Sequence, residues 1–205
     1  MTSLQWENNL HKVKDIQHLS CYALTIEPHT LIATQIKKGI LTPLDEEKII
    51  EQIHLLLQFA DNNKFRHYEI SNFCKENYFS RHNYAYWQRK PYLGLGTAAH
   101  SYNITARQWN VANINKYMKY IHEIYRYPDP NKVYNNYENR LFEKEILTHT
   151  MQINEYIMTA LRTDKGIDLT TMETDFSTTI KHLLLQKMTH INDQYYLIKD
   201  NHIVL

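Results

Sequence analysis

The residues best suited to chemistry in this sequence gather between positions 68 and 102. An imidazole and an amide stand side by side at His82 and Asn83, and two large aromatic residues follow at Tyr86 and Trp87. Imidazole nitrogens are common metal ligands, and aromatic faces pack against flat molecules. The segment therefore predicts a ligand site in which His82 is the candidate metal ligand.

A glycine-spaced apolar run, Tyr92-Leu93-Gly94-Leu95-Gly96, follows this group, and small residues then lead to His100 and Ser101. The chain has four glycines among 205 residues, well below the average of about 7%. Glycine lets the backbone pass close to a flat or bulky neighbour. We therefore expect the ligand to lie against this run.

Each of these residues also has a structural interpretation. His82 can be a loop histidine that is hydrogen-bonded to backbone, and Tyr86 and Trp87 can pack a core or a lid. Arg81 and Arg89 can be solvated surface residues, or they can bind ligand carboxylates in a bidentate manner.

Two acidic residues are further candidates. Glu69 lies inside a predicted strand, so it either points into the mouth of a barrel or pairs with a cation, because a buried unpaired carboxylate is costly. Glu27, just past the end of another predicted strand, can be a site residue, or it can have a structural role only.

The elements that must position these residues alternate between strand and helix. Leu19–Ile26 is a nearly continuous apolar run, which predicts a strand buried on both faces. A helix capped by Asp45 follows, and its apolar stripe is Ile49, Ile53, Leu56, Leu57 and Ala60. Further strands are predicted over His67–Ser71 and Tyr92–Gly96. A strand–helix–strand unit of this length predicts a parallel sheet with a right-handed crossover.

In such sheets, chemistry collects at the carboxyl ends of the strands. Here those ends are residues 25–27, 71–73 and 97–101, and polar side chains occur at each of them. The fold class predicted for residues 1–110 is therefore α/β, with parallel strands and helices outside.

The later part of the chain has helical spacing. Asn113 can cap a helix, and Tyr127–Asn131 contains two prolines and reads as a linker. A long helix follows and ends near Gly166, Asp168 and Ser177 can each start a short helix, and Ile191–Leu205 predicts a hairpin with turn pairs at 192–193 and 200–201. Residues 111–205 are thus predicted to form a mostly helical, winged-helix-like domain.

Several blocks of the sequence resemble the oxygen-independent coproporphyrinogen III oxidases and the related heme chaperones of the radical S-adenosylmethionine (SAM) superfamily. These blocks are residues 19–28 (LSCYALTIEP), 68–73 (YEISNF), 81–87 (RHNYAYW), 92–96 (YLGLG) and 155–163 (EYIMTALRT). The His-Asn-x-x-Tyr-Trp sextet at 82–87 points to the heme-chaperone branch rather than to the true oxidases.

The resemblance implies a fold, cofactors and site residues. Residues 1–110 would be the C-terminal part of a partial (β/α) TIM-like barrel. Thr25 and His100 match positions on the SAM side of the family pocket. His82, Asn83, Tyr86 and Trp87 would contact heme or porphyrin, with His82 either as the axial ligand of the iron or against a propionate of the porphyrin.

The family motif Cys-x-x-x-Cys-x-x-Cys, which holds a [4Fe–4S] cluster through thiolates, is missing. The chain has only Cys21 and Cys74. We therefore expect SAM and the cluster to belong to a longer parent protein, of which this chain is the C-terminal portion, and we expect the chain alone to be inactive as a coproporphyrinogen dehydrogenase-type enzyme. A natural cluster-free paralogue is the alternative.

The predicted function is a piece of a heme chaperone or oxidase-like protein, and the alternative is a stand-alone winged-helix-like module that binds protein or nucleic acid. A net charge of +1 gives no argument for nucleic acid. The sequence has no membrane-length apolar run and no signal-peptide pattern. The expected partners are heme or porphyrin, the rest of the parent barrel, and a second copy through an exposed barrel edge. Two scattered cysteines indicate the cytoplasm.

Overall fold

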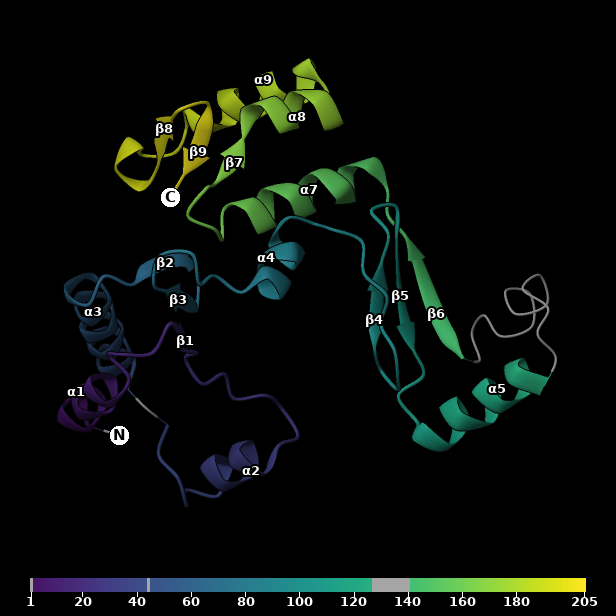
Figure 1. Cartoon of the computed structure of the whole chain (residues 1–205), viewed down its shortest axis with the longest axis horizontal. Coiled ribbons are helices and arrows are strands. Elements are labelled where there is room, and N and C mark those ends of the chain that lie inside the picture. Colours follow the sequence, from purple (N-terminus) through teal and green to yellow (C-terminus); the bar gives the residue numbers. More distant parts are fainter. Residues whose placement is uncertain (1, 44, 127–140) are drawn as a thin grey trace. The chain divides into compact units, whose positions relative to one another are not determined.

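The fold is that of a computed structural model, which describes residues 2–43, 45–126 and 141–205. The chain divides into two compact units, Met1–Arg81 and His82–Leu205 (Figure 1). The linker predicted at Tyr127–Asn131 lies outside the described residues. The domain boundary predicted at residue 110 falls inside the second unit and stays a prediction.

The first unit begins with a helix and ends with a hairpin. Its elements are α1 (Ser3–Lys12), β1 (His18–Ser20), α2 (Leu31–Lys37), α3 (Glu46–Asn62), β2 (Arg66–Glu69) and β3 (Asn72–Cys74). As predicted, α3 starts at Asp45, whose carboxylate accepts the backbone N–H of Glu47 at 3.1 Å. This bond satisfies one of the free donors at the helix start.

The sheet of the first unit has the order β1-β3-β2, and β3 is antiparallel to both neighbours. The predicted parallel pairing is therefore wrong for these strands. The turn at Ile70 and Ser71 sends the chain straight back, and a two-residue turn of this kind joins antiparallel strands only. β3 thus takes the place beside β1 that the parallel arrangement gives to β2.

The first strand is also shorter than the apolar run that predicted it. β1 ends at Ser20, and although the N–H of Cys21 still donates to the carbonyl oxygen of Ser71 at 2.8 Å, Tyr22 and Leu24 are exposed. An uninterrupted apolar run does not show how many of its residues pair with neighbouring strands. The predicted strand was therefore too long.

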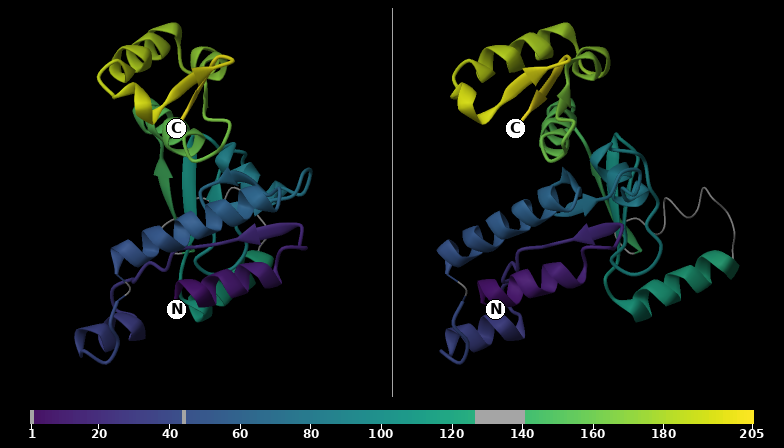
Figure 2. Two further views of the ribbon diagram at one scale, coloured as in Figure 1. Left: turned by 90° about the vertical axis from the view of Figure 1, so that its left-hand side faces the viewer. Right: turned by 60° about the vertical axis from the view of Figure 1, so that its left-hand side comes forward.

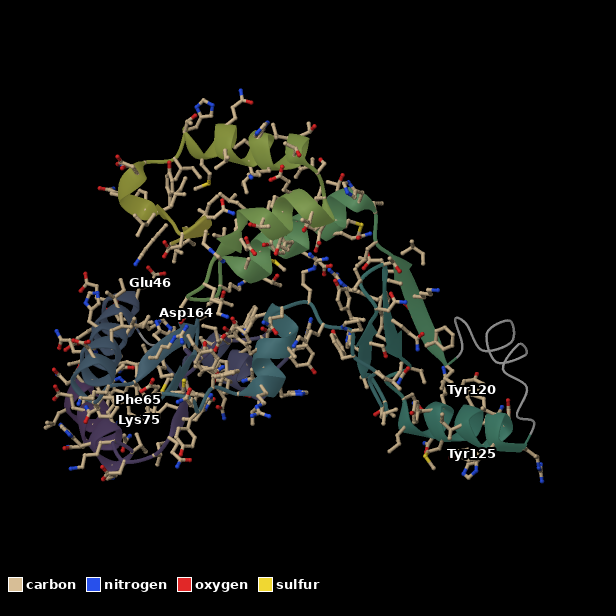
Figure 3. The ribbon with its side chains drawn as sticks, turned by 45° about the horizontal axis from the view of Figure 1, so that its top comes forward. Glu46, Phe65, Lys75, Tyr120, Tyr125 and Asp164 are labelled. Carbon is tan, nitrogen blue, oxygen red and sulfur yellow. The ribbon has the colours of Figure 1, made fainter. Side chains whose placement is uncertain are left out.

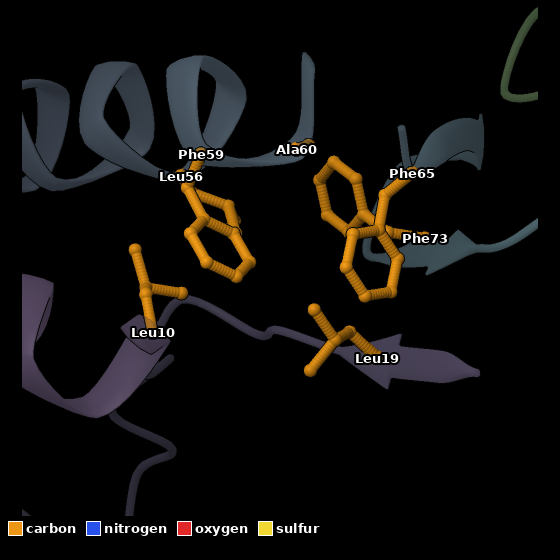
Figure 4. Packing of buried hydrophobic residues seen from close by; sticks show 7 residues of the cluster. All are labelled: Leu10, Leu19, Leu56, Phe59, Ala60, Phe65 and Phe73. Carbon is orange, nitrogen blue, oxygen red and sulfur yellow. The ribbon is translucent and has the colours of Figure 1, made fainter. Parts of the chain in front are cut away.

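The core of the first unit lies between the two long helices and the sheet (Figure 4). α1 and α3 pack against each other (Figure 2). The buried members of this core are Leu10, Leu19, Leu56, Phe59, Ala60, Phe65 and Phe73. The predicted stripe on α3 is confirmed at Leu56 and Ala60 and is wrong at Ile53 and Leu57, which are exposed.

One rim of this core is closed by a cation. The Nζ of Lys75 lies 4.1 Å from the centre of the Phe65 ring (Figure 3) and donates to the carbonyl oxygen of Asn63. The ammonium group therefore covers an aromatic face while it donates a hydrogen bond to the backbone.

The second unit contains the remaining described elements. They are α4 (Arg81–Trp87, whose first residue is counted with the first unit), β4 (His100–Tyr102), β5 (Ala106–Asn110), α5 (Ile114–Arg126), β6 (Phe142–Ile146), α7 (His149–Ala160), β7 (Ile167–Asp168), α8 (Leu169–Asp175), α9 (Thr178–Met188), the 3-10 helix η1 (Asp193–Tyr195), β8 (Leu197–Lys199) and β9 (His202–Val204).

An antiparallel sheet of order β4-β5-β6 was not predicted. The strand expected over Tyr92–Gly96 contributes one bridge, between Tyr92 and Tyr102, so that prediction is wrong for most of its length. The turn between β4 and β5 depends on Asn103, whose Oδ1 accepts the N–H of Ala106 at 2.8 Å. This side-chain turn leaves a weak sequence signal.

Most of the C-terminal elements agree with the sequence prediction, although α7 ends at Ala160 and not near Gly166. Asp168 and Ser177 cap α8 and α9, and their side chains accept the N–H groups of Thr170 and Ile180. The turn pair Asp200–Asn201 has φ angles of 49° and 63° and joins β8 to β9. The buried core of this part of the unit consists of Ala160, Ile167, Leu169, Met172, Met188 and Ile203. Among the helices of the described ranges, none combines the length and the apolar character needed to cross a bilayer.

Candidate functional site

The sextet that the sequence singled out forms helix α4. Its i, i+4 spacing places His82 and Tyr86 on one face, and their rings meet edge to face with centres 4.9 Å apart and planes at 84°. Both side chains are exposed, whereas Asn83 and Trp87 are half-buried. The structure therefore brings the four predicted residues onto one short helix and leaves the imidazole of His82 open to solvent.

A chain of aromatic rings runs inward from His82. The ring of Tyr86 meets that of Tyr92 edge to face at 4.7 Å, and Tyr92 lies 6.0 Å from Tyr102. Tyr102 is only 7% exposed. Burial raises the pKa of Tyr92 above its ordinary value. One end of the ring chain is thus solvated and the other is anchored in the unit.

The helix ends at an arginine. Arg89 has a left-handed φ of 54°, its N–H donates to the carbonyl of Tyr86 at 2.9 Å, and the N–H of Lys90 donates to that of Ala85 at 3.0 Å. This pattern closes a helix C-terminus. The guanidinium of Arg89 lies over Tyr156 and Phe176, which the sequence had not linked to it.

The glycine run lets the backbone pass close to a neighbour, as expected, and at Gly94 that neighbour is strand β4. A Cβ at Gly94 would stand 2.1 Å from the carbonyl oxygen of His100. The N–H of Gly94 donates to Oγ of Ser101 at 2.9 Å, and Asn110 donates to the carbonyl oxygens of Gly94 and Gly96 at 3.3 and 2.9 Å. The close neighbour of Gly94 is therefore the backbone of β4, and the ligand contact expected for the run stays a prediction.

His100 begins β4 on the exposed face of the sheet. Its ring stacks on Trp109 of β5, with centres 6.2 Å apart, and the indole N–H of Trp109 donates to Oε2 of Glu143 at 3.2 Å. Sequence reasoning missed Trp109 and Glu143, because their link to His100 depends on the register of the unpredicted sheet.

The remaining candidates lie in the first unit. Thr25 and Glu27 are exposed in the segment between β1 and α2. Glu69 is 4% exposed at the end of β2, where its Oε1 accepts the N–H of Ser71 at 3.2 Å. Neither alternative offered by the sequence for Glu69 describes this contact, which supports the tight turn into β3.

An iron–sulfur cluster does not fit the residues of this chain. Cys21 is half-buried and Cys74 is buried, and neither is part of a disulfide. Burial raises the pKa of the Cys21 thiol, which opposes the thiolate that a cluster requires. Across the described residues, no three side chains of the His, Cys, Asp or Glu type gather to hold a metal ion.

Comparisons with known proteins agree with the resemblance seen in the motifs. No protein-family model matches the chain. The chain is 27% identical to the heme chaperone HemW of Lactococcus lactis over 185 residues, which cover 90% of this chain and 45% of that protein. It is 34% identical to HemW of Bacillus subtilis over 109 residues, which cover 53% and 29%.

Two further similar proteins are a radical SAM domain protein and a coproporphyrinogen III oxidase. A mitochondrial radical S-adenosyl methionine domain-containing protein 1 from Bos taurus is 39% identical over 83 residues, 40% of this chain and 19% of that protein. The solved structure of coproporphyrinogen III oxidase (HemN) from Escherichia coli superposes with a TM-score of 0.68 at 14% identity and covers 99% of this chain and 48% of that one. The homologues are thus heme chaperones and radical SAM domain proteins, the fold is α/β like that of HemN, and the chain spans less than half the length of each.

Proposed function

We propose that this chain is the heme-binding segment of a heme-chaperone-type radical SAM protein, and that His82 is the axial ligand of the heme iron. The observation that carries the proposal is the exposed imidazole of His82 at the outer end of the ring chain on α4. The similarity to HemW along 90% of the chain supports the choice of heme.

The chemistry of the four residues on α4 suits this role. A neutral imidazole donates a nitrogen lone pair to heme iron. The ring of Tyr86, which meets the imidazole edge to face, restricts its rotation, and Tyr86 and Trp87 offer apolar faces to a porphyrin. Asn83, next to the ligand, can hydrogen-bond to a porphyrin carboxylate.

We also propose the finer architecture. Residues 1–110 correspond to the C-terminal part of a TIM-like barrel, and the similarity to HemN supports this view. Residues 111–205 end in a winged-helix-like arrangement, which the order α7, β7, α8, α9, β8, β9 and the sheet order β7-β9-β8 support. A role in binding nucleic acid is not favoured, since Lys181, one of the few cations on α9, is paired with Glu173 at 2.7 Å.

Other parts of the proposal concern the parent protein. Thr25 and His100 would lie on the SAM side of a barrel that other residues complete, and the [4Fe–4S] cluster would be held outside this chain. Two cysteines outside any disulfide are consistent with a cytoplasmic protein.

Hemin titration tests the central claim. Binding to the wild-type chain should shift the Soret band from that of free hemin, and His82→Ala should weaken binding and alter the band while leaving the circular dichroism spectrum unchanged. Because the chain has 12 histidines, His100→Ala is the matched control and should bind hemin like wild type. If both variants bind hemin as wild type does, the sextet is a structural element and the proposal fails.

A further inference from the structure

Arg89 joins three elements of the second unit through its side chain. The guanidinium carbon lies 5.6 Å from the ring centre of Tyr156 on α7 and 5.4 Å from that of Phe176 at the end of α8. The Nε–H donates to the hydroxyl of Tyr102 on β4 at 3.3 Å. Because the side chain is half-buried, these cation–aromatic contacts are stronger than they would be in open water.

The backbone of Arg89 occupies a position that glycine fills most easily. Its left-handed φ of 54° follows the last turn of α4, where its N–H and that of Lys90 close the helix. A glycine would adopt this conformation without a Cβ clash. The arginine therefore accepts backbone strain at the point where α4 ends, and its side chain fixes the direction of that end.

The same residue reaches the inner end of the ring chain. Tyr102, which accepts the hydrogen bond from Arg89, is followed outward by Tyr92 and Tyr86, and Tyr86 meets His82. Arg89 is thus connected to the sextet by two routes. One is the backbone that ends α4, and the other is its hydrogen bond to the hydroxyl of Tyr102. Its guanidinium faces aromatic rings, an arrangement unlike the carboxylate contact that the sequence allowed.

We propose that Arg89 is a positioning residue for the His82 site: it fastens α4 to α7, α8 and β4, so that the imidazole is presented in one orientation. This inference rests on the proposed heme function. Arg89 acts through α4 and Tyr102 and has no part in ligating the iron.

Two substitutions of Arg89 and one neighbouring control test this role in the whole chain. Arg89→Gly removes the side chain and suits the backbone, and Arg89→Lys keeps the charge but loses the flat face and the Nε–H. Lys90→Ala removes one positive charge from an exposed adjacent position. Amide hydrogen exchange across α4 and the spectrum of bound hemin are measured for each variant.

Both Arg89 variants should exchange the amides of α4 about tenfold faster, the effect of losing desolvated cation–aromatic contacts, and their hemin spectra should move toward that of His82→Ala. Lys90→Ala should match wild type in both measurements. If Arg89→Gly folds poorly, Phe176→Leu removes one of the two rings that the guanidinium contacts and leaves α4 unaltered. It should produce the same faster exchange and the same change in the hemin spectrum.

The outcomes separate this inference from the function beneath it. Unchanged exchange in Arg89→Gly and Phe176→Leu overturns the positioning role, and so does faster exchange with a wild-type hemin spectrum. If His82→Ala binds hemin as wild type does, the heme function fails and the role of Arg89 toward that site fails with it.

Discussion

His82 and Tyr86 stand one turn apart on α4, and their rings meet edge to face with centres 4.9 Å apart. Tyr86 lies against an imidazole that is exposed to solvent. The same Tyr86 ring passes the contact on to Tyr92 at 4.7 Å. A solvated candidate ligand is therefore connected to the packed part of its unit by a series of ring contacts.

This relationship predicts different roles for the histidine and the tryptophan of the sextet. Iron–imidazole ligation sets both the spectrum and much of the affinity, whereas an aromatic face only covers the porphyrin. Trp87→Ala should therefore weaken hemin binding less than His82→Ala and should leave the Soret position nearly unchanged. Titrations followed by absorbance check this order.

The control for that comparison is Trp109→Ala. Trp109 contacts His100 and Glu143 rather than α4, so its removal should leave hemin binding as in wild type. A larger loss of affinity in Trp87→Ala than in His82→Ala would make stacking, and not ligation, the main source of binding.

A second prediction concerns the close approach at Gly94. Gly94→Ala places a methyl group 2.1 Å from the carbonyl oxygen of His100, a backbone atom that cannot turn aside. The substitution should destabilise the chain by about 2 kcal/mol, as overpacking does in other cores, and should disturb the bridge between Tyr92 and Tyr102. Urea unfolding measures the loss.

Ala98→Gly is the matched control in the same segment. Ala98 already has a left-handed φ of 56°, so glycine relieves strain there while it adds freedom to the unfolded chain, and stability should change by less than about 0.5 kcal/mol. Equal losses of stability in Gly94→Ala and Ala98→Gly would show that the segment is sensitive to any substitution, and would contradict a specific clash at Gly94.

The sequence predicted the elements that depend on local signals. Asp45, Asp168 and Ser177 cap helices as expected, because a cap needs only its own side chain and an N–H two or three residues on. The turn at Asp200–Asn201 was also predicted, since these residue types tolerate a positive φ. The four residues of the sextet were identified by type and spacing, and one helix does bring them together.

The sequence did not predict what depends on pairing over a distance. The sheet β4-β5-β6 brings Trp109 beside His100 and Glu143, but its strands are short and lack strong alternation. The strand–helix–strand pattern predicted parallel pairing, but the two-residue turn after β2 makes β2 and β3 antiparallel. The ring contacts of Arg89 join α4 to α7 and α8, and no local pattern of residues shows such a contact.

A third prediction follows from the titration of Tyr156. Burial, and after it the charge of Asp168, raises the pKa of Tyr156 to about 12, while its hydroxyl donates to the carbonyl oxygen of Asp168 at 2.9 Å. An unfolded tyrosine titrates near pH 10. Below about pH 10 both states keep the proton and the stabilisation is fully present; between about pH 10 and 12 only the unfolded chain loses it, so stability falls as pH rises.

Tyr156→Phe tests this dependence. The variant should lose about 1 kcal/mol at neutral pH with its hydrogen bond, and its stability should decline less steeply over the alkaline range, because it has no proton to release. Urea unfolding at several pH values measures both slopes, and Tyr195→Phe, at an exposed position, should keep the wild-type slope. Parallel slopes for Tyr156→Phe and wild type would contradict the assignment.

The last prediction concerns self-association through the first unit. β1 is an edge strand of its sheet, and the segment after it carries apolar side chains in water: Tyr22, Leu24 and Leu31 are 71%, 74% and 72% exposed. Apolar surface next to an unpaired strand edge favours contact with another chain. The mass measured by light scattering should therefore rise with protein concentration.

Serine substitutions locate the surface responsible. Leu24→Ser combined with Leu31→Ser should lower the apparent mass toward that of a single chain, because burying these two side chains no longer gains the free energy of removing apolar area from water. Leu4→Ser, which changes an equally apolar residue that is 66% exposed on α1, should leave association unchanged. A wild-type chain that stays strictly monomeric at high concentration would contradict the prediction, and equal effects of Leu4→Ser and the double variant would place the contact elsewhere.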